Sequence, residues 1–211
     1  MTPGSDSYLQ RLIEAGEGLH QDFKYKVADA PKLARSISAF ANTEGGRLLV
    51  GIRDDGSISG VRSEEEIYML QAAAQRYCTP RMEIDFQSIR TQGRTIVIAT
   101  IGRATHRPVR AIDETGKRTA YLRIKDENII ASPVHIAMWK QEQCSTVITN
   151  YGADEACLIE QLAQHPHCHL NTLIKLTHIG RRQVISTLAR LIRYELAECL
   201  LIDHQFCFSL R

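Results

Sequence analysis

The chain of 211 residues is long enough for one large domain or two small ones, and 44% of it is hydrophobic and 24% charged. This composition is typical of globular proteins and excludes a disordered chain, a collagen-like fibre and a coiled-coil rod. The 26 basic and 24 acidic residues give a net charge of +2. Any contact with nucleic acid must therefore come from a local basic patch.

The cellular location is the next point that the sequence addresses. The longest apolar runs, such as Leu48–Ile52 and Ile96–Ile101, are far too short for a transmembrane helix. The first residues lack the basic start and apolar stretch of a signal peptide. The six cysteines form no Cys-x-x-Cys pair, which favours reduced thiols. We therefore expect a cytoplasmic protein.

The first 150 residues alternate helical and extended patterns, which predicts a mixed α+β domain with much antiparallel pairing. Pro31 suits the first turn of a helix that Gly45-Gly46 ends. Helices are expected over residues 8–15, 31–42, 63–74 and 132–139. Strands are expected over residues 21–25, 48–52, 58–61, 82–90, 95–101, 108–113 and 119–124.

The composition changes near residue 150, after which only Gly152 and Gly180 remain of the glycines. Three helices are expected after this point, over residues 154–163, 171–177 and 181–198. Two strands follow them, over residues 199–202 and 206–210. This is the order of a winged helix-turn-helix. We therefore expect a domain over residues 1–142, a linker over 143–153 and a winged helix-turn-helix domain over 154–211.

The helix expected from Arg181 carries the strongest binding signal. Val184, Leu188 and Leu191 form an apolar stripe on it, and polar side chains lie opposite. In a DNA major groove Arg pairs with guanine and Gln with adenine, while Ser and Thr reach bases or phosphates. The predicted DNA-binding residues are Arg181, Arg182, Gln183, Ser186, Thr187 and Arg190. A helix used for protein contact or dimerisation is the alternative.

A second basic group lies on two adjacent strands of the first domain. Its members, Arg107, Arg110, Lys117, Arg118 and Arg123, are predicted to bind phosphates. The alternative is a solvated sheet edge, on which charges prevent pairing with other chains.

Four residues of the first domain suggest a different chemistry. Glu17, Asp22, Lys24 and Asp54 follow the acid–x–Lys plus acid pattern of metal-dependent nucleases. If the chain is a nuclease, Glu17, Asp22 and Asp54 hold Mg²⁺ or Mn²⁺, and Lys24 steadies the attacking water or the developing charge. The alternative is a strand with surface salt bridges.

Several motifs resemble one known family. They are Gly16-Glu17, Asp22-Phe23-Lys24, the run Ser38-Ala39-Phe40-Ala41-Asn42-Thr43-Glu44-Gly45-Gly46, Gly51-Ile52-Arg53-Asp54-Asp55-Gly56 with Gly60, and Tyr121-Leu122-Arg123. Over about residues 10–140 they resemble the Schlafen AlbA-type domain. The resemblance implies a compact α+β domain, and its bacterial members are described as DNA-binding or transcriptional-regulator proteins.

The animal relatives in this family imply a second activity, the cleavage of structured RNA. The acids of that activity map onto Glu17, Asp22 and Asp54. This chain departs from the pattern at Asp22, where the family usually has Glu, and at Arg53, where an acid is frequent.

Together these observations predict an α+β protein, with a Schlafen AlbA-like mixed-sheet domain followed by a C-terminal winged-helix domain. The expected function is that of a bacterial DNA-binding transcriptional regulator. Its tail reads duplex DNA, and its first domain binds phosphates, forms a homodimer, or does both. No cofactor and no membrane partner are expected. The alternative is an endoribonuclease that uses Mg²⁺ or Mn²⁺. A signal-binding module has the least support, because the sequence has no phosphate-cradling motif.

Overall fold

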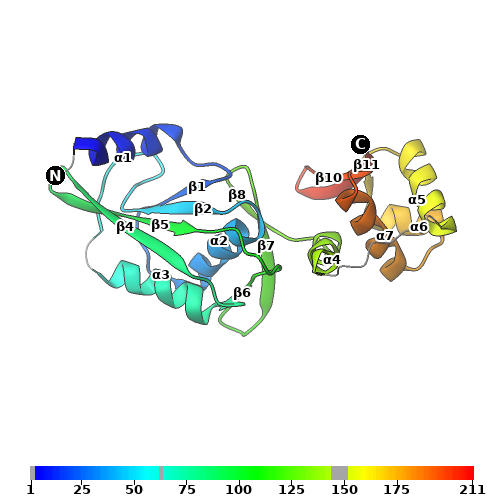
Figure 1. Ribbon diagram of the computed structural model, residues 1–211, viewed down its shortest axis with the longest axis horizontal. Helices are drawn as coiled ribbons and strands as arrows, with labels where there is room; N and C mark the ends of the chain where they lie inside the picture. The colour runs from blue at the N-terminus through cyan, green and yellow to red at the C-terminus, as the bar shows by residue number, and fades with distance from the viewer. Residues whose placement is uncertain (1–2, 62–63, 144–151) are drawn as a thin grey trace. The chain divides into compact units, whose positions relative to one another are not determined.

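Two units make up the chain, unit 1 over Met1–Ile130 and unit 2 over Ala131–Arg211. The computed structural model describes residues 3–61, 64–143 and 152–211. Both units combine helices with β-sheets, which confirms the expected mixed α+β class (Figure 1). In this described part of the chain, no helix is long and apolar enough to cross a bilayer.

A four-stranded mixed sheet forms the centre of unit 1, in the order β1-β2-β5-β4. Strands β1 (Gln21–Lys24) and β2 (Gly46–Val50) are parallel, and helix α2 (Ala30–Asn42) connects them. Strands β5 (Arg94–Ile101) and β4 (Ile84–Thr91) continue the sheet as antiparallel neighbours. The parallel pair brings the ends of β1 and β2 to the same edge of the sheet, next to the start of α2.

Helices cover both faces of this sheet (Figure 1). Leu48 and Val50 of β2 pack into the core that includes α2 and α3 (Glu65–Arg76). Leu49, which lies between them, packs into a second core with α1 (Pro3–Ala15). Because successive side chains of a strand point to opposite faces, a strand buried on both faces has a continuous apolar sequence. This explains the apolar run of β2 that the sequence shows.

Helix α2 also packs against a second sheet, with the strand order β3-β6-β7-β8. These strands are Cys78–Thr79, Arg110–Ile112, Arg118–Ile124 and Glu127–Ile130. Asn42 near the end of α2 donates through Nδ2 to the carbonyls of Val109 (2.7 Å) and Tyr121 (2.9 Å). Gly46 begins β2 directly against α2, because a Cβ there would lie 2.3 Å from the Phe40 ring. The glycine is therefore required by the close approach of the two elements.

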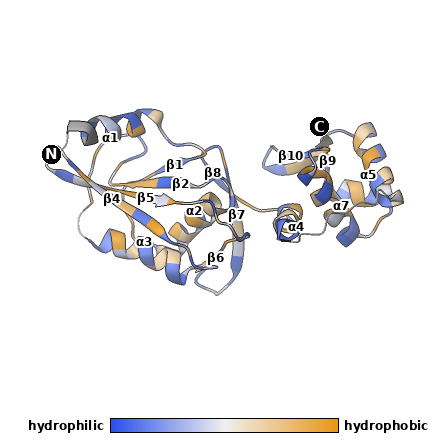
Figure 2. Ribbon diagram, in the orientation of Figure 1, coloured by the Kyte–Doolittle hydropathy of each residue, from blue (hydrophilic) through white to orange (hydrophobic). Residues whose placement is uncertain are grey.

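Unit 2 has its own core. Its helices are α4 (Pro133–Glu142), α5 (Ala153–Gln164), α6 (Leu170–Thr177) and α7 (Arg181–Arg193). Its sheet has the order β10-β11-β9, with strands Ala197–Ile202, Gln205–Leu210 and Cys168–His169. Leu158, Leu173, Leu188 and Phe208 are buried at the centre. Apolar and polar residues alternate along α5 and α7, as expected of helices that bury one face (Figure 2).

The structure differs from the expected organisation at several places. The strand expected over residues 58–61 is only an isolated β-bridge between Ile58 and Ile52. Helix α4 packs against α7, so residues 131–142 group with unit 2 and not with the first domain. Helix α7 ends at Arg193, because Glu195 takes a left-handed φ of 59° and strand β10 begins two residues later. Gly152 caps α5, and Asp154 lies in the first turn. Most of the expected linker, residues 144–151, lies outside the described residues, as does Ser63 at the start of the expected third helix.

Candidate functional site

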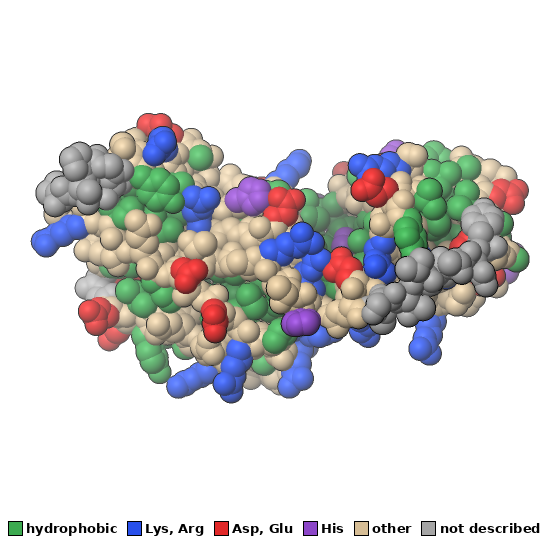
Figure 3. Space-filling model, viewed as in Figure 1, with side chains coloured by type: hydrophobic (Ala, Val, Ile, Leu, Met, Phe, Trp, Pro, Cys, Tyr) green, Lys and Arg blue, Asp and Glu red, His purple; other side chains and the backbone are tan. Residues whose placement is uncertain are grey.

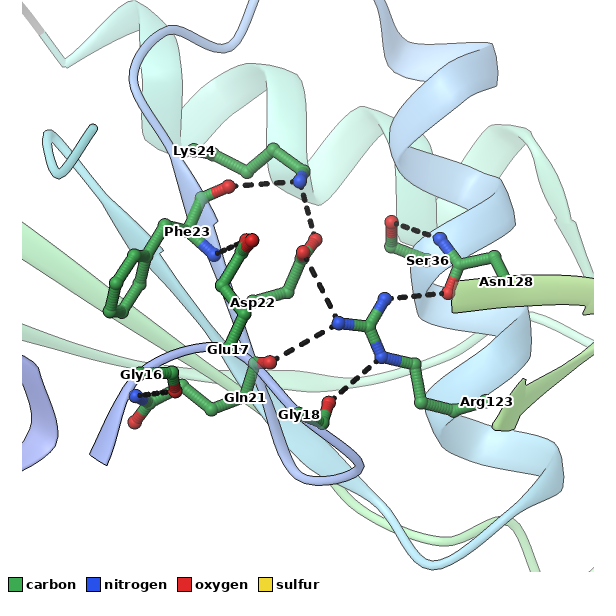
Figure 4. Close-up of polar contacts among 10 residues, drawn as sticks. All are labelled: Gly16, Glu17, Gly18, Gln21, Asp22, Phe23, Lys24, Ser36, Arg123 and Asn128. Carbon is green, nitrogen blue, oxygen red and sulfur yellow. Dashed lines mark hydrogen bonds and ion pairs between the residues drawn. The ribbon is translucent and has the colours of Figure 1, made fainter. Parts of the chain in front are cut away.

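The acidic residues predicted in the first domain lie at the start of β1. Glu17 belongs to the loop before the strand, and its Oε1 accepts a hydrogen bond from the Phe23 backbone N–H at 2.8 Å. Asp22 is buried, and its Oδ2 lies 2.5 Å from Lys24 Nζ. Asp22 and Lys24 share one face of β1 because they are two residues apart. The local strand geometry thus brings three of the four predicted residues together (Figure 4).

Arg123 of β7 completes this cluster (Figure 4). Its Nη2 lies 3.3 Å from Asp22 Oδ1, and its guanidinium also donates to the carbonyls of Gly18 (3.0 Å) and Gln21 (3.2 Å). Its Nη1 donates to Asn128 Oδ1 at 3.0 Å. The planar guanidinium has several donors in a fixed geometry, which suits a buried site with several acceptors.

This position corrects the prediction for Arg123. The residue is only 2% exposed, so it is not part of a phosphate-binding surface. The physical reason is the buried carboxylate of Asp22, which requires a charged and hydrogen-bonded partner. On strand β7 the side chain of Arg123 points toward α2, where it lies over the Phe40 ring.

The two carboxylates of the cluster influence each other. Burial raises the pKa of Glu17, the Phe23 N–H opposes that rise, and the adjacent Asp22 carboxyl adds to it. Glu17 and Asp22 face two basic groups, Lys24 and Arg123, so the cluster is close to charge balance without a metal ion.

Asp54 does not complete a three-carboxylate site with them. It lies exposed in the turn after β2. Among the residues that the structure describes, no group of three His, Cys, Asp or Glu side chains could hold a metal ion. The predicted ligands Glu17, Asp22 and Asp54 therefore do not fit a divalent metal, and we derive no metal-dependent step from them.

The predicted DNA-binding residues of α7 fall into two groups. Arg181, Arg182 and Gln183 are exposed in the first turn of the helix, and Arg181 donates to Asn171 Oδ1 at 2.8 Å. A turn of three residues, His178 to Gly180, precedes them, with His178 in the left-handed conformation.

The other predicted residues of α7 make contacts within unit 2. Thr187 is buried, which corrects its prediction as a surface residue. Arg190 forms a part-buried ion pair with Glu155 of α5. The backbone carbonyl of Ser186 accepts from Gln141 Nε2 of α4 at 3.0 Å. Helices α4 and α5 therefore engage this part of the polar face, and the first turn remains exposed.

The basic strands of unit 1 are exposed only in part. Lys117 and Arg118 are exposed at the β6–β7 hairpin, whose turn is held by Asp113. Arg110 is half-buried, and Arg107 donates to the Asn42 carbonyl at 3.1 Å. In the face drawn in Figure 3, Lys and Arg side chains gather near the end of α3 and this hairpin.

Sequence reasoning named Lys26 as a possible extension of the basic strands, but it did not group Lys26 with Arg53 and Arg94. Lys26, Arg53 and Arg94 line open hollows beyond the ends of β1 and β2, although they are far apart in the sequence. Only the parallel pairing of β1 with β2, together with the fold of the loop after β2, brings them together. The motif from Gly51 to Gly60 indicated this loop in the sequence, but it did not indicate that Lys26 and Arg94 lie beside the loop.

Comparison with known proteins gives one family and a general fold. The family model described as Schlafen, AlbA_2 matches residues 17–132, which is more than half of the chain. No curated protein matches the chain.

Two solved structures are similar to the chain. The DIP2311 protein from Corynebacterium diphtheriae is 16% identical, with a TM-score of 0.51 over 97% of this chain. This chain spans only 38% of that protein, and at this identity the likeness shows the fold alone. The N-terminal domain of an ATP-dependent DNA helicase RecG-related protein from Nitrosomonas europaea is 19% identical, with a TM-score of 0.42, 72% of this chain covered and 99% of that domain.

Proposed function

Because the chain belongs to the Schlafen, AlbA_2 family, we propose that it is a DNA-binding transcriptional regulator whose unit 2 reads duplex DNA. Family membership supports a nucleic-acid-related function. The observation that carries the choice of duplex DNA is the exposed first turn of α7, with Arg181, Arg182 and Gln183 side by side. In helix-turn-helix proteins the first residues of the recognition helix contact the base edges.

We further propose that unit 2 is a winged helix-turn-helix domain. Helices α6 and α7 are joined by three residues that include Gly180, which is the usual length for this motif. The hairpin of β10 and β11 follows, and its two turn residues, Asp203 and His204, both have a positive φ. Such two-residue turns match the twist of a hairpin, so the hairpin can project as a rigid wing.

Unit 1 has a supporting role in this proposal. Lys117 and Arg118 would contact phosphates, and a homodimer would place two copies of α7 on one duplex. The Glu17–Asp22 pair serves the structure of unit 1, because Lys24 and Arg123 neutralise it. This arrangement favours a binding protein over the metal-dependent endoribonuclease.

The proposal predicts that Arg181→Ala with Arg182→Ala weakens binding to a mixed-sequence duplex of roughly 30 base pairs. We expect a loss of about tenfold or more near 0.1 M salt. The dependence of log K on log salt should also become shallower, by at most about 1.8, because each phosphate that a lost arginine neutralised contributes about 0.9. Fluorescence anisotropy of a labelled duplex at several salt concentrations measures both quantities.

Arg193→Ala is the matched control for this experiment. Arg193 is exposed at the other end of the same helix, about 18 Å from Arg181 at 1.5 Å per residue. Arg190 is unsuitable because its replacement would leave Glu155 without its partner. Equal affinities for the double variant and the wild type would contradict the proposal. Mn²⁺-dependent cleavage of a structured RNA that Asp54→Asn abolishes would favour the endoribonuclease instead.

A further inference from the structure

Two open hollows adjoin each other at the edge of unit 1 where β1 and β2 end. The first, which we name the Arg53 hollow, has a volume of about 290 Å³, and its lining includes Tyr25, Arg53 and Arg94. The second, the Lys32 hollow, also has about 290 Å³ and includes Lys24 and Lys32. Lys26 lines both, so the two hollows are neighbours, and we call them together the groove. We propose that this groove binds a single strand of nucleic acid, with phosphates on its basic residues and a base against Tyr25.

The charge of the groove favours a phosphate ligand. Of its five basic residues, Lys24 is paired with Asp22 and Lys32 lies 3.3 Å from Asp29. Lys26, Arg53 and Arg94 share the Arg53 hollow with one carboxylate, that of Glu66. The hydrogen bonds of Ser57 and, to a lesser extent, the charge of Arg53 lower the pKa of the neighbouring Asp55. Arg94 donates to the carbonyl of Ile58. Three basic side chains against one carboxylate in this hollow create a local positive potential, although the whole chain is nearly neutral.

Tyr25 provides the contact for a base. Its side chain is among the exposed large hydrophobic groups, at 45% of its maximum, and the Arg53 guanidinium lies 4.9 Å from the centre of its ring. Exposed aromatic rings beside basic residues are the usual means by which proteins bind single strands, since every base can stack on a ring. The α2 N-terminus adds nothing here, because Asp29 already caps it.

The backbone around the groove is preorganised. The Gly51 carbonyl accepts from the N–H groups of Ser59 (2.8 Å) and Gly60 (2.9 Å), and the Gly51 N–H donates to the Lys24 carbonyl at 2.8 Å. A Cβ at Gly51 would lie 2.8 Å from the Gly60 backbone, and Gly60 has a φ of +75°. Glycine is therefore needed at both positions. A loop fixed in this way loses little entropy when it binds a ligand.

The shape of the groove favours a strand over other ligands. A small-molecule site encloses most of its ligand, whereas this groove is open, so a strand can enter and leave. The groove also lies beyond the carboxyl ends of two parallel strands, which is the usual ligand-binding edge of such sheets.

The inference rests on the proposed function and adds a second, separate site to it. The probe is a labelled oligothymidylate of roughly 12 nucleotides, titrated with the full chain. Lys26→Gln with Arg53→Gln should weaken binding about tenfold and make the salt dependence shallower by about 1.4, since each single-strand phosphate contributes about 0.7. Tyr25→Leu should weaken binding by a similar factor without a change in salt dependence, because stacking releases no counterions.

Arg76→Gln with Arg81→Gln is the matched control, since it removes two exposed charges from the same unit. Arg76 lies about 15 Å along α3 from Glu66, which lines the Arg53 hollow. If the control and groove variants lost equal amounts of affinity for the oligothymidylate, the inference would be overturned. It would also be overturned if thymidine monophosphate displaced the oligonucleotide at a concentration similar to that of unlabelled oligonucleotide. The Arg181→Ala, Arg182→Ala variant should keep its affinity for the oligonucleotide, and the groove variants should keep theirs for the duplex. Failure of the duplex site and failure of the groove are therefore distinguishable.

Discussion

Arg123 shows how one buried cation organises a whole loop of unit 1. It binds the backbone carbonyls of Gly18 and Gln21 and the carboxylate of Asp22, and so fixes the entry into β1. Arg118, on the same strand, is exposed. The alternation of side chains along β7 explains this difference in burial only in part. The decisive factor is the carboxylate of Asp22, which lies next to Arg123.

At this scale we expect that Arg123→Met lowers the free energy of unfolding of unit 1 by about 3–5 kcal/mol. This is the usual cost of removing one partner from a buried ion pair. Adding Asp22→Asn should recover about 1 kcal/mol or more, because no buried carboxylate is then left without its partner. Urea denaturation of the wild type, both single variants and the double variant completes the cycle. A double variant no more stable than Arg123→Met would show that Asp22 does not depend on Arg123.

His135 of α4 gives a prediction for pH. Burial lowers the pKa of this histidine to about 4, Ser132 Oγ lies 2.8 Å from its Nδ1, and its ring packs against Phe206. Since the unfolded chain has the ordinary value of about 6.5, it binds a proton between pH 6.5 and 4 that the folded chain does not. The stability contributed by neutral His135 is therefore complete above pH 6.5 and is lost as the pH falls toward 4.

Between pH 7 and pH 5 this loss should amount to about 2 kcal/mol for unit 2. His135→Phe keeps an aromatic ring at the site and removes the titration, so the difference in stability between wild type and variant should change by that amount. Unfolding in urea at both pH values measures it. The two proteins differ only at this position, so a difference in stability that is independent of pH would contradict the assignment.

At the scale of elements, the sequence predicted most helices and strands of both units but not what covers α7. The apolar stripe of α7 was evident from its spacing, and Val184 and Leu188 are buried as expected. Helix α4 has apolar residues around most of its circumference, so its sequence does not indicate one contact face. Its packing on α7, through Gln141 and Ser186, depends on contacts between segments that are 45 residues apart.

The same limit applies to the candidate sites. Local patterns were sufficient to bring Asp22 and Lys24 together, because residues two apart on a strand share a face. They were not sufficient for Arg123, which is 101 residues from Asp22, or for the groove, which several separate segments form. For such sites, sheet order and register are needed before residues can be assigned to a common surface.

At the scale of the whole molecule, the two units have separate hydrophobic cores. The core around Phe40 and Leu48 belongs to unit 1, and the core around Leu158 and Leu188 belongs to unit 2. A unit with its own core can fold alone. The boundary at Ile130 implies that unit 2 needs α4, since Val134 and Trp139 are buried in it.

We therefore expect a fragment of residues 131–211 to unfold cooperatively and a fragment of residues 154–211 to lack a cooperative transition. Trp139 is the single tryptophan of the chain and is 3% exposed, so its fluorescence reports on unit 2 alone. In the full chain, Arg123→Met should destabilise unit 1, so that its unfolding transition, followed by circular dichroism, moves to lower denaturant concentration. The transition of unit 2, followed by Trp139 fluorescence, should stay in place. His135→Phe at pH 5 should do the reverse, because it removes the protonation that destabilises unit 2 at that pH. If either substitution moved both transitions equally, the two units would unfold as one, and the boundary at Ile130 would not separate two independently stable domains.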